Sequence, residues 1–152
     1  MRRNRSRMGT ELIPANEVAG SLRNGAQEKS IISFIDDQAP PSVRKGQWIR
    51  FLNQDTLVNP GMERLAVITN RPVIFVEIKK LKRGYYEIRL VEIAKNPSRT
   101  QPMEITERFN KANEDLIRQY PEYWLWSHRR WKHKRVSPTE QLPINLRSVA
   151  KG

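Results

Sequence analysis

The hydrophobic pattern in the first half of the chain predicts two helices and two strands. A short helix is expected over residues 16–24, because a proline stands near its start and a glycine follows it. The apolar run over 31–35 predicts a buried strand, and the apolar residues of 48–52 predict another. A further helix is expected over 59–70, since asparagine followed by proline is a favoured helix start.

The second half of the chain predicts a hairpin and a longer helix. Residues 72–81 and 85–93 are rich in β-branched and aromatic residues and flank a Lys-Arg-Gly turn, which is typical of two antiparallel strands. Over 103–119, apolar residues recur at helical spacing and form one stripe that we expect to lie in the core. The stripe consists of Ile105, Phe109, Ala112 and Leu116.

The order of these elements predicts an α/β fold with a mixed sheet flanked by helices. Only about four strands are visible in the pattern, so we expect a partner to supply more. Residues 136–152 contain two prolines and little periodicity. The domain is therefore expected to span 1–135, followed by a flexible tail over 136–152.

Charge narrows the range of partners. The chain of 152 residues has 28 Lys and Arg against 16 Asp and Glu, a formal charge of +12. This excess indicates an acidic partner, which is a nucleic acid, an anionic membrane or an acidic protein. The chain contains no cysteine, which excludes disulfides and thiolate chemistry. No apolar run approaches the ~18 residues of a spanning helix.

Residues 120–132, the aromatic-basic segment, hold the most informative pattern in the chain. Five aromatic residues alternate there with His128, Arg129, Arg130 and Lys132. One interpretation places these four polar residues against an anionic headgroup, with the indoles beneath them or at a membrane interface. The alternative is a structural C-terminal helix, whose indoles fill the core and whose charges are solvated.

The aromatic-basic segment also resembles a known signature. Residues 121–132 are similar to the near-C-terminal motif of the bacterial lipid A biosynthesis acyltransferases, the lauroyl and myristoyl transferases, with one residue fewer. Residues 33–38 are similar to that family's hydrophobic strand ending in Asp-Gln. Further similar segments follow in the family's order at 46–52, 61–69 and 84–86. The resemblance implies the C-terminal half of a glycerolipid or lipid A acyltransferase-like fold.

The family's catalytic histidine motif is missing from this sequence. That motif is His-x-x-x-x-Asp or His-x-x-x-x-Glu, in which histidine acts as general base. The chain has only His128 and His133, and neither is followed by a carboxylate at that spacing. We therefore assign no catalytic residue and expect a truncated chain that is inactive alone. No metal is implied, because two neighbouring carboxylates are a weak ligand set.

The resemblance implies substrates and a location as well. The parent activity transfers a fatty acyl group from a thioester to a hydroxyl of a lipid A precursor or related lipid. The donor is carried by acyl carrier protein or by coenzyme A, and no other cofactor is implied. The partners are thus a donor carrier, an anionic lipid acceptor and a membrane surface. The expected location is peripheral, at the cytoplasmic face of the bacterial inner membrane.

Two further groups of residues are candidates for substrate binding. Asp37 and Gln38 stand where a strand is expected to end, and the resemblance implies that they position a basic residue or the acceptor. The alternative is a polar turn at the end of that strand. Arg5 and Arg7 resemble a family segment suggestive of phosphate or carrier contact, and arginine suits phosphate. The alternative is a solvated basic arm.

A second class of function competes with the acyltransferase. A basic domain with exposed aromatic residues could bind nucleic acid through phosphate contacts and stacking. The ordered inner matches argue against such a binding module, as does the lack of a recognisable nucleic-acid motif. The sequence therefore favours the acyltransferase and does not favour nucleic acid as a partner.

Overall fold

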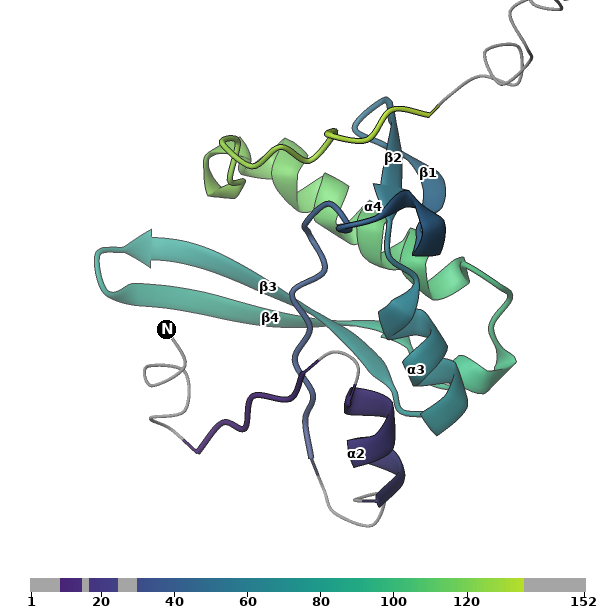
Figure 1. The fold of residues 1–152 in the computed structure, drawn as a ribbon. Coiled ribbons are helices and arrows are strands. Elements are labelled where there is room, and N and C mark those ends of the chain that lie inside the picture. Colours follow the sequence, from purple (N-terminus) through teal and green to yellow (C-terminus); the bar gives the residue numbers. More distant parts are fainter. Residues whose placement is uncertain (1–8, 15–16, 25–29, 136–152) are drawn as a thin grey trace, which may run out of the picture.

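The computed structural model describes residues 9–14, 17–24 and 30–135, and it has a mixed α/β fold. In these ranges there are three α-helices and two separate antiparallel hairpins, and the second hairpin extends outward from the helices (Figure 1). The helices are α2 (Val18–Asn24), α3 (Gly61–Thr69) and α4 (Glu104–Gln119). The strands are β1 (Gln47–Phe51), β2 (Gln54–Val58), β3 (Val73–Lys82) and β4 (Tyr85–Ala94). Short 3-10 turns lie at Val43–Lys45, Pro97–Arg99 and Pro121–Tyr123.

The first hairpin is held to α4 at its turn. Leu52 and Asn53 connect β1 to β2 with φ angles of 48° and 63°, the left-handed pair that a two-residue turn requires. A leucine at positive φ is strained, so the turn needs support from elsewhere. The Leu52 amide donates to Glu114 Oε2 of α4 at 3.1 Å. This contact fixes the position of the hairpin along the helix.

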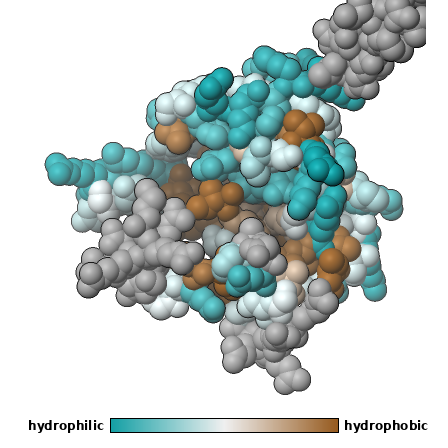
Figure 2. Space-filling view, in the orientation of Figure 1, coloured by the Kyte–Doolittle hydropathy of each residue, from teal (hydrophilic) through white to brown (hydrophobic). Residues whose placement is uncertain are grey.

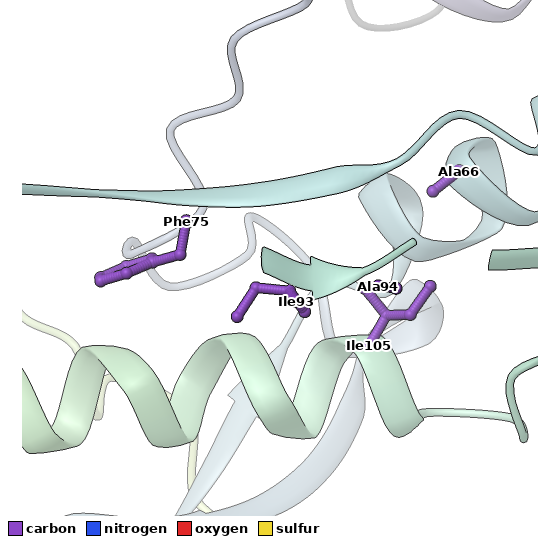
Figure 3. Packing of buried hydrophobic residues seen from close by; sticks show 5 residues of the cluster. All are labelled: Ala66, Phe75, Ile93, Ala94 and Ile105. Carbon is purple, nitrogen blue, oxygen red and sulfur yellow. The ribbon is translucent and has the colours of Figure 1, made fainter. Parts of the chain in front are cut away.

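The main core lies where the second hairpin meets α3 and α4. Phe75 of β3, Ile93 and Ala94 of β4, Ala66 of α3 and Ile105 of α4 form one buried cluster (Figure 3). The stripe predicted for α4 contributes to it as expected, since Phe109, Ala112 and Leu116 pack against this cluster. The α4 helix contacts both hairpins and so joins the two sheets.

A buried carboxylate links the two longer helices. Glu63 of α3 is 5% exposed and accepts hydrogen bonds from the Thr106 amide, at 2.9 Å, and from the Thr106 hydroxyl. Thr106 stands in the first turn of α4, where amides lack a partner within the helix. A negative charge there also suits the helix dipole. Glu63 therefore caps α4 from a neighbouring helix.

Most of the predicted elements are confirmed, but the sheet is not. The helices expected over 16–24, 59–70 and 103–119 correspond to α2, α3 and α4, and the predicted hairpin corresponds to β3 and β4. The predicted mixed sheet is wrong for the described residues, because their four strands form two separate antiparallel pairs. The expectation that a partner supplies further strands stays a prediction.

The strand expected over 31–35 is also wrong. The segment has no regular secondary structure, and Ile31 and Ile35 are 99% and 67% exposed. A strand needs a neighbour for its backbone groups, and none of the strands in the described ranges pairs with this segment. β2 was missed because Leu57 and Val58 are its only apolar residues.

Candidate functional site

The aromatic-basic segment folds as a series of tight turns and not as the helix of the structural alternative. After α4, Pro121–Tyr123 form one 3-10 turn. The amides of Trp126, His128 and Arg130 then donate to carbonyls only two or three residues back, at 2.8–2.9 Å. Proline at the start breaks the helical ladder. The expected C-terminal helix is therefore wrong, and the segment's side chains meet distant parts of the chain instead.

Two of the segment's three indoles are anchored in the first hairpin. The Trp131 Nε1–H donates to the hydroxyl of the buried Thr56 at 2.8 Å. The ring of Trp124 lies 6.0 Å from that of Phe51. Trp126 is 58% exposed and its Nε1–H donates to the nearby Pro121 carbonyl at 2.7 Å. Packing thus explains Trp124 and Trp131, and Trp126 remains at the surface.

Arg130 is buried beneath the segment. It is 2% exposed, and its Nη1 donates to the Leu57 carbonyl at 2.7 Å. The guanidinium carbon lies 5.8 Å from the centre of the Phe51 ring, within range of a cation–π contact. Its Nε atom is buried and finds no hydrogen-bond partner among the described residues. A buried charge in this state needs a counter-ion nearby.

Asp36 and Asp37 supply that counter-charge. Burial lowers the pKa of Arg130, and the charges of the two carboxylates act against this change. Asp37 Oδ1 is buried and, like the Arg130 Nε, has no hydrogen-bond partner within the described ranges. We call these three residues the charge cluster. It joins the 31–37 segment to the aromatic-basic segment across more than ninety residues of sequence.

The two histidines fasten the next residues of the same loop. The Ala39 amide donates to His128 Nε2 at 3.1 Å, so the neutral His128 ring carries its proton on Nδ1. His133 Nε2 lies 2.8 Å from the Pro40 carbonyl, to which it must donate. Each histidine therefore holds one backbone group of the 39–40 loop. Neither Nε2 atom is available to take a proton from a substrate in this arrangement.

The structure brings some of the predicted site residues together and leaves others apart. Asp37 lies near Arg130 in the charge cluster and His128 binds Ala39 of the same loop, whereas Gln38 between them in sequence is exposed. Arg129 and Lys132 are exposed on the segment, and Arg5 and Arg7 lie outside the described residues, as does the tail over 136–152. Sequence reasoning missed Asp36 as part of the charge cluster. The feature of the sequence that could have identified Asp36 is the pair of adjacent aspartates, since two neighbouring acidic side chains require a basic partner when buried.

The described residues define neither a metal site nor a deep pocket at the charge cluster. Within these ranges, no three His, Asp or Glu side chains gather as a metal site requires. Two shallow hollows lie on the surface, one between β4 and α4 and one between the second hairpin and Tyr120. Neither includes Asp37 or His128. The charge cluster therefore lies outside both hollows.

The charge cluster predicts an unusual pH dependence. Burial raises the pKa of Asp36 from 3.8 to about 6, the nearby Asp37 charge adds to this, and the Arg130 charge opposes it. Between pH 3.8 and about pH 6, Asp36 keeps a proton in the folded chain that it has lost in the unfolded chain. The free energy of unfolding contributed by Asp36 therefore falls as pH rises through this window, by on the order of 1–2 kcal/mol for a partly buried group.

Two measurements test this pH dependence. Carbon-13 NMR of the Asp36 carboxyl is expected to give a midpoint near pH 6. Urea unfolding at several pH values is expected to show a slope that the variant Asp36→Asn flattens. An NMR midpoint close to the ordinary value near 3.8 would show that the carboxyl is solvated.

Comparison with known proteins identifies a family. Residues 1–133 match a family model described as bacterial lipid A biosynthesis acyltransferase. Among curated proteins, no sequence matches the chain. The family match covers all described residues except the last two, and it includes every residue of the charge cluster and both histidines.

Proposed function

The chain belongs to the bacterial lipid A biosynthesis acyltransferase family, and we propose on this basis that it serves the transfer of a fatty acyl group to a lipid hydroxyl. The acceptor in this proposal is a lipid A precursor or a related lipid, and the donor is a thioester of acyl carrier protein or coenzyme A. The observation that carries the proposal is the family match over residues 1–133 of 152.

The proposed role of this chain is binding and not proton transfer. Acyl transfer to a hydroxyl requires a general base beside the oxygen. Neither histidine has a carboxylate at the family's spacing, His128 Nε2 already accepts a hydrogen bond from Ala39, and only Nδ1 of His133 is left to take a proton, without a carboxylate to support the ring. The residues near the charge cluster therefore supply groups that hold the acceptor, and the base has to come from elsewhere.

The charge cluster suits an acceptor that carries hydroxyl and phosphate groups. Asp37 is half-buried at the edge of the charge cluster, and its carboxylate can accept a hydrogen bond from a hydroxyl. Gln38 is exposed beside it and offers both donors and an acceptor. Arg129 and Lys132 are exposed and can pair with phosphate oxygens. The Arg130 guanidinium lies behind them, and its positive charge attracts Asp37.

The proposed location follows from the proposed substrate. A chain that acts on lipid A precursors has to work at a membrane, on the side where acyl donors are made. We therefore propose peripheral attachment at the cytoplasmic face of the inner membrane, which the charge of +12 supports. None of the helices in the described ranges has the length and hydrophobicity that a bilayer crossing demands.

Binding of a phosphorylated acceptor tests the proposed function. A lipid A precursor in neutral detergent micelles is expected to shift the NMR signals of Asp37, Gln38 and His128. The variant Arg129→Gln/Lys132→Gln is expected to bind about tenfold to a hundredfold more weakly, because it loses two charged phosphate contacts. Isothermal titration or fluorescence anisotropy measures the affinity.

A matched variant separates phosphate contacts from net charge. Arg64→Gln/Lys95→Gln removes the same charge from two exposed residues outside the aromatic-basic segment. We expect it to retain nearly full affinity. Equal losses in both variants, or no signal changes around Asp37, would show that the acceptor does not bind at the charge cluster.

A further inference from the structure

One face of the second hairpin is apolar and open. The register places Val76 opposite Leu90 and Ile78 opposite Ile88, and Ile74 lies on the same face. These five side chains are between 48% and 65% exposed. A contiguous row of this kind marks an interaction surface on a water-soluble domain. Figure 2 shows hydrophobic residues reaching the surface in patches between hydrophilic ones.

The opposite face of the hairpin is the one that this chain already uses. Glu77 pairs with Arg89 there at 2.9 Å, and Phe75 enters the main core. Lys79 lies 5.2 Å from the ring of Tyr120, just past α4. The apolar row therefore points away from α4 and the aromatic-basic segment. Because side chains alternate between the two faces along both strands, one face packs within this chain and the other is open to a separate partner.

The turn of the hairpin adds a basic tip. Residues 79–86 contain Lys79, Lys80, Lys82 and Arg83 and no acidic residue. Leu81, Tyr85 and Tyr86 are about 60% exposed among them. Lys82 Nζ lies 4.3 Å from the centre of the Tyr85 ring. The hairpin projects as an arm, with this tip at its far end (Figure 1). Its charge is complementary to an anionic surface.

We propose that the second hairpin docks on the surface of an anionic lipid bilayer. The apolar row enters the boundary between headgroups and acyl chains, tyrosines lie at the headgroup level, and the basic tip pairs with anionic headgroups. A nucleic acid would use the basic tip but would leave the isoleucine and leucine row in water. The inference deepens the proposed function, on which it rests for the membrane setting, by naming the surface that holds the chain at its lipid substrate.

The hairpin is a better candidate than the aromatic-basic segment for this contact. Arg130 is buried, and Trp124 and Trp131 are engaged with the first hairpin. Beside the exposed Arg129 and Lys132, that segment exposes Tyr123, Leu125 and Trp126, which are fewer apolar side chains than the five of the hairpin row. Binding to a bilayer gains from both charge and apolar area.

Vesicle pelleting tests the inference with variants of equal charge. The tip variant Lys80→Glu/Lys82→Glu/Arg83→Glu is compared with the control variant Arg129→Glu/Lys132→Glu/Lys134→Glu. All six residues are exposed, and both variants change the net charge equally. On vesicles of phosphatidylethanolamine and phosphatidylglycerol, the tip variant is expected to bind roughly a hundredfold more weakly than the parent. The control variant is expected to lose much less.

The apolar row has its own test. The variant Ile78→Thr/Ile88→Thr keeps β-branched side chains but removes apolar area. We expect it to lose the binding that persists at high salt, where headgroup attraction is screened. Vesicles of phosphatidylcholine alone should bind the parent weakly. Circular dichroism verifies that each variant keeps the parent fold.

Several outcomes would overturn the inference. A tip variant that pellets like the parent, or a control variant that loses equally, excludes the hairpin as the docking surface. A parent dimer that Ile78→Thr/Ile88→Thr dissociates assigns the apolar row to protein contact, and RNA binding without vesicle binding assigns the tip to nucleic acid. A chain that binds the phosphorylated acceptor in micelles but ignores vesicles removes this inference and leaves the proposed function standing.

Discussion

Replacing Arg130 by alanine is expected to lower the free energy of unfolding by about 3–5 kcal/mol, the usual cost of leaving buried charge without its counter-charge. The substitution leaves Asp36 and Asp37 without their counter-charge and the Leu57 carbonyl without its donor. It also removes the cation from the Phe51 ring and opens a cavity. Urea unfolding followed by tryptophan fluorescence measures the change, because Trp124 and Trp131 lie against the same hairpin.

The neighbouring arginine is the natural control. Arg129 is exposed, so Arg129→Ala should change the stability by less than about 0.5 kcal/mol. The loss of stability in Arg130→Lys should lie between the losses in the two alanine variants, since lysine keeps the charge but lacks the planar guanidinium. If Arg130→Ala cannot be purified folded, Arg130→Lys still gives a measurable difference from Arg129→Lys. Equal stability of the two alanine variants would mean that Arg130 is solvated.

Residues whose partners lie close in sequence were predicted well. The stripe Ile105, Phe109, Ala112 and Leu116 identified α4, because helical periodicity depends only on neighbours three or four positions away. The Lys-Arg-Gly turn identified the second hairpin for the same reason. Composition of the 31–35 segment was misleading. Apolar residues indicate burial, but a strand forms only beside another strand.

The candidate site depends on contacts that no local pattern contains. His128 meets Ala39, Arg130 meets Leu57 and Trp131 meets Thr56, at separations of 89, 73 and 75 residues. The adjacent Arg129 and Arg130 have the same side chain, yet one is exposed and one is buried. Resemblance to a family drew attention to these residues, but the three-dimensional fold alone separates the buried arginine from the exposed one.

The chain by itself is expected to show no acyl transfer above the uncatalysed rate. Loss of a general base typically costs about 10²–10⁴-fold in rate. In this chain His128 accepts a hydrogen bond from the Ala39 amide, and His133 donates one to the Pro40 carbonyl. Neither histidine is followed by a carboxylate at the spacing of the family's catalytic motif. The measurement follows a labelled acyl group from acyl carrier protein or coenzyme A to a lipid A precursor. The protein is present at a concentration at which catalysed transfer would exceed the background hydrolysis of the thioester.

The histidine variants decide what a positive result would mean. If the purified chain transfers acyl groups and His128→Ala abolishes the transfer, then His128 releases the Ala39 amide and acts as the base, and the assignment of a binding role is wrong. If transfer persists in His128→Ala and in His133→Ala, neither histidine is the base, and the expectation of an inactive chain is wrong. An inactive chain that still binds the phosphorylated acceptor through Arg129 and Lys132 is the expected combination. It separates substrate binding, which these residues supply, from proton transfer, for which the chain has no free histidine Nε2 atom among the described residues.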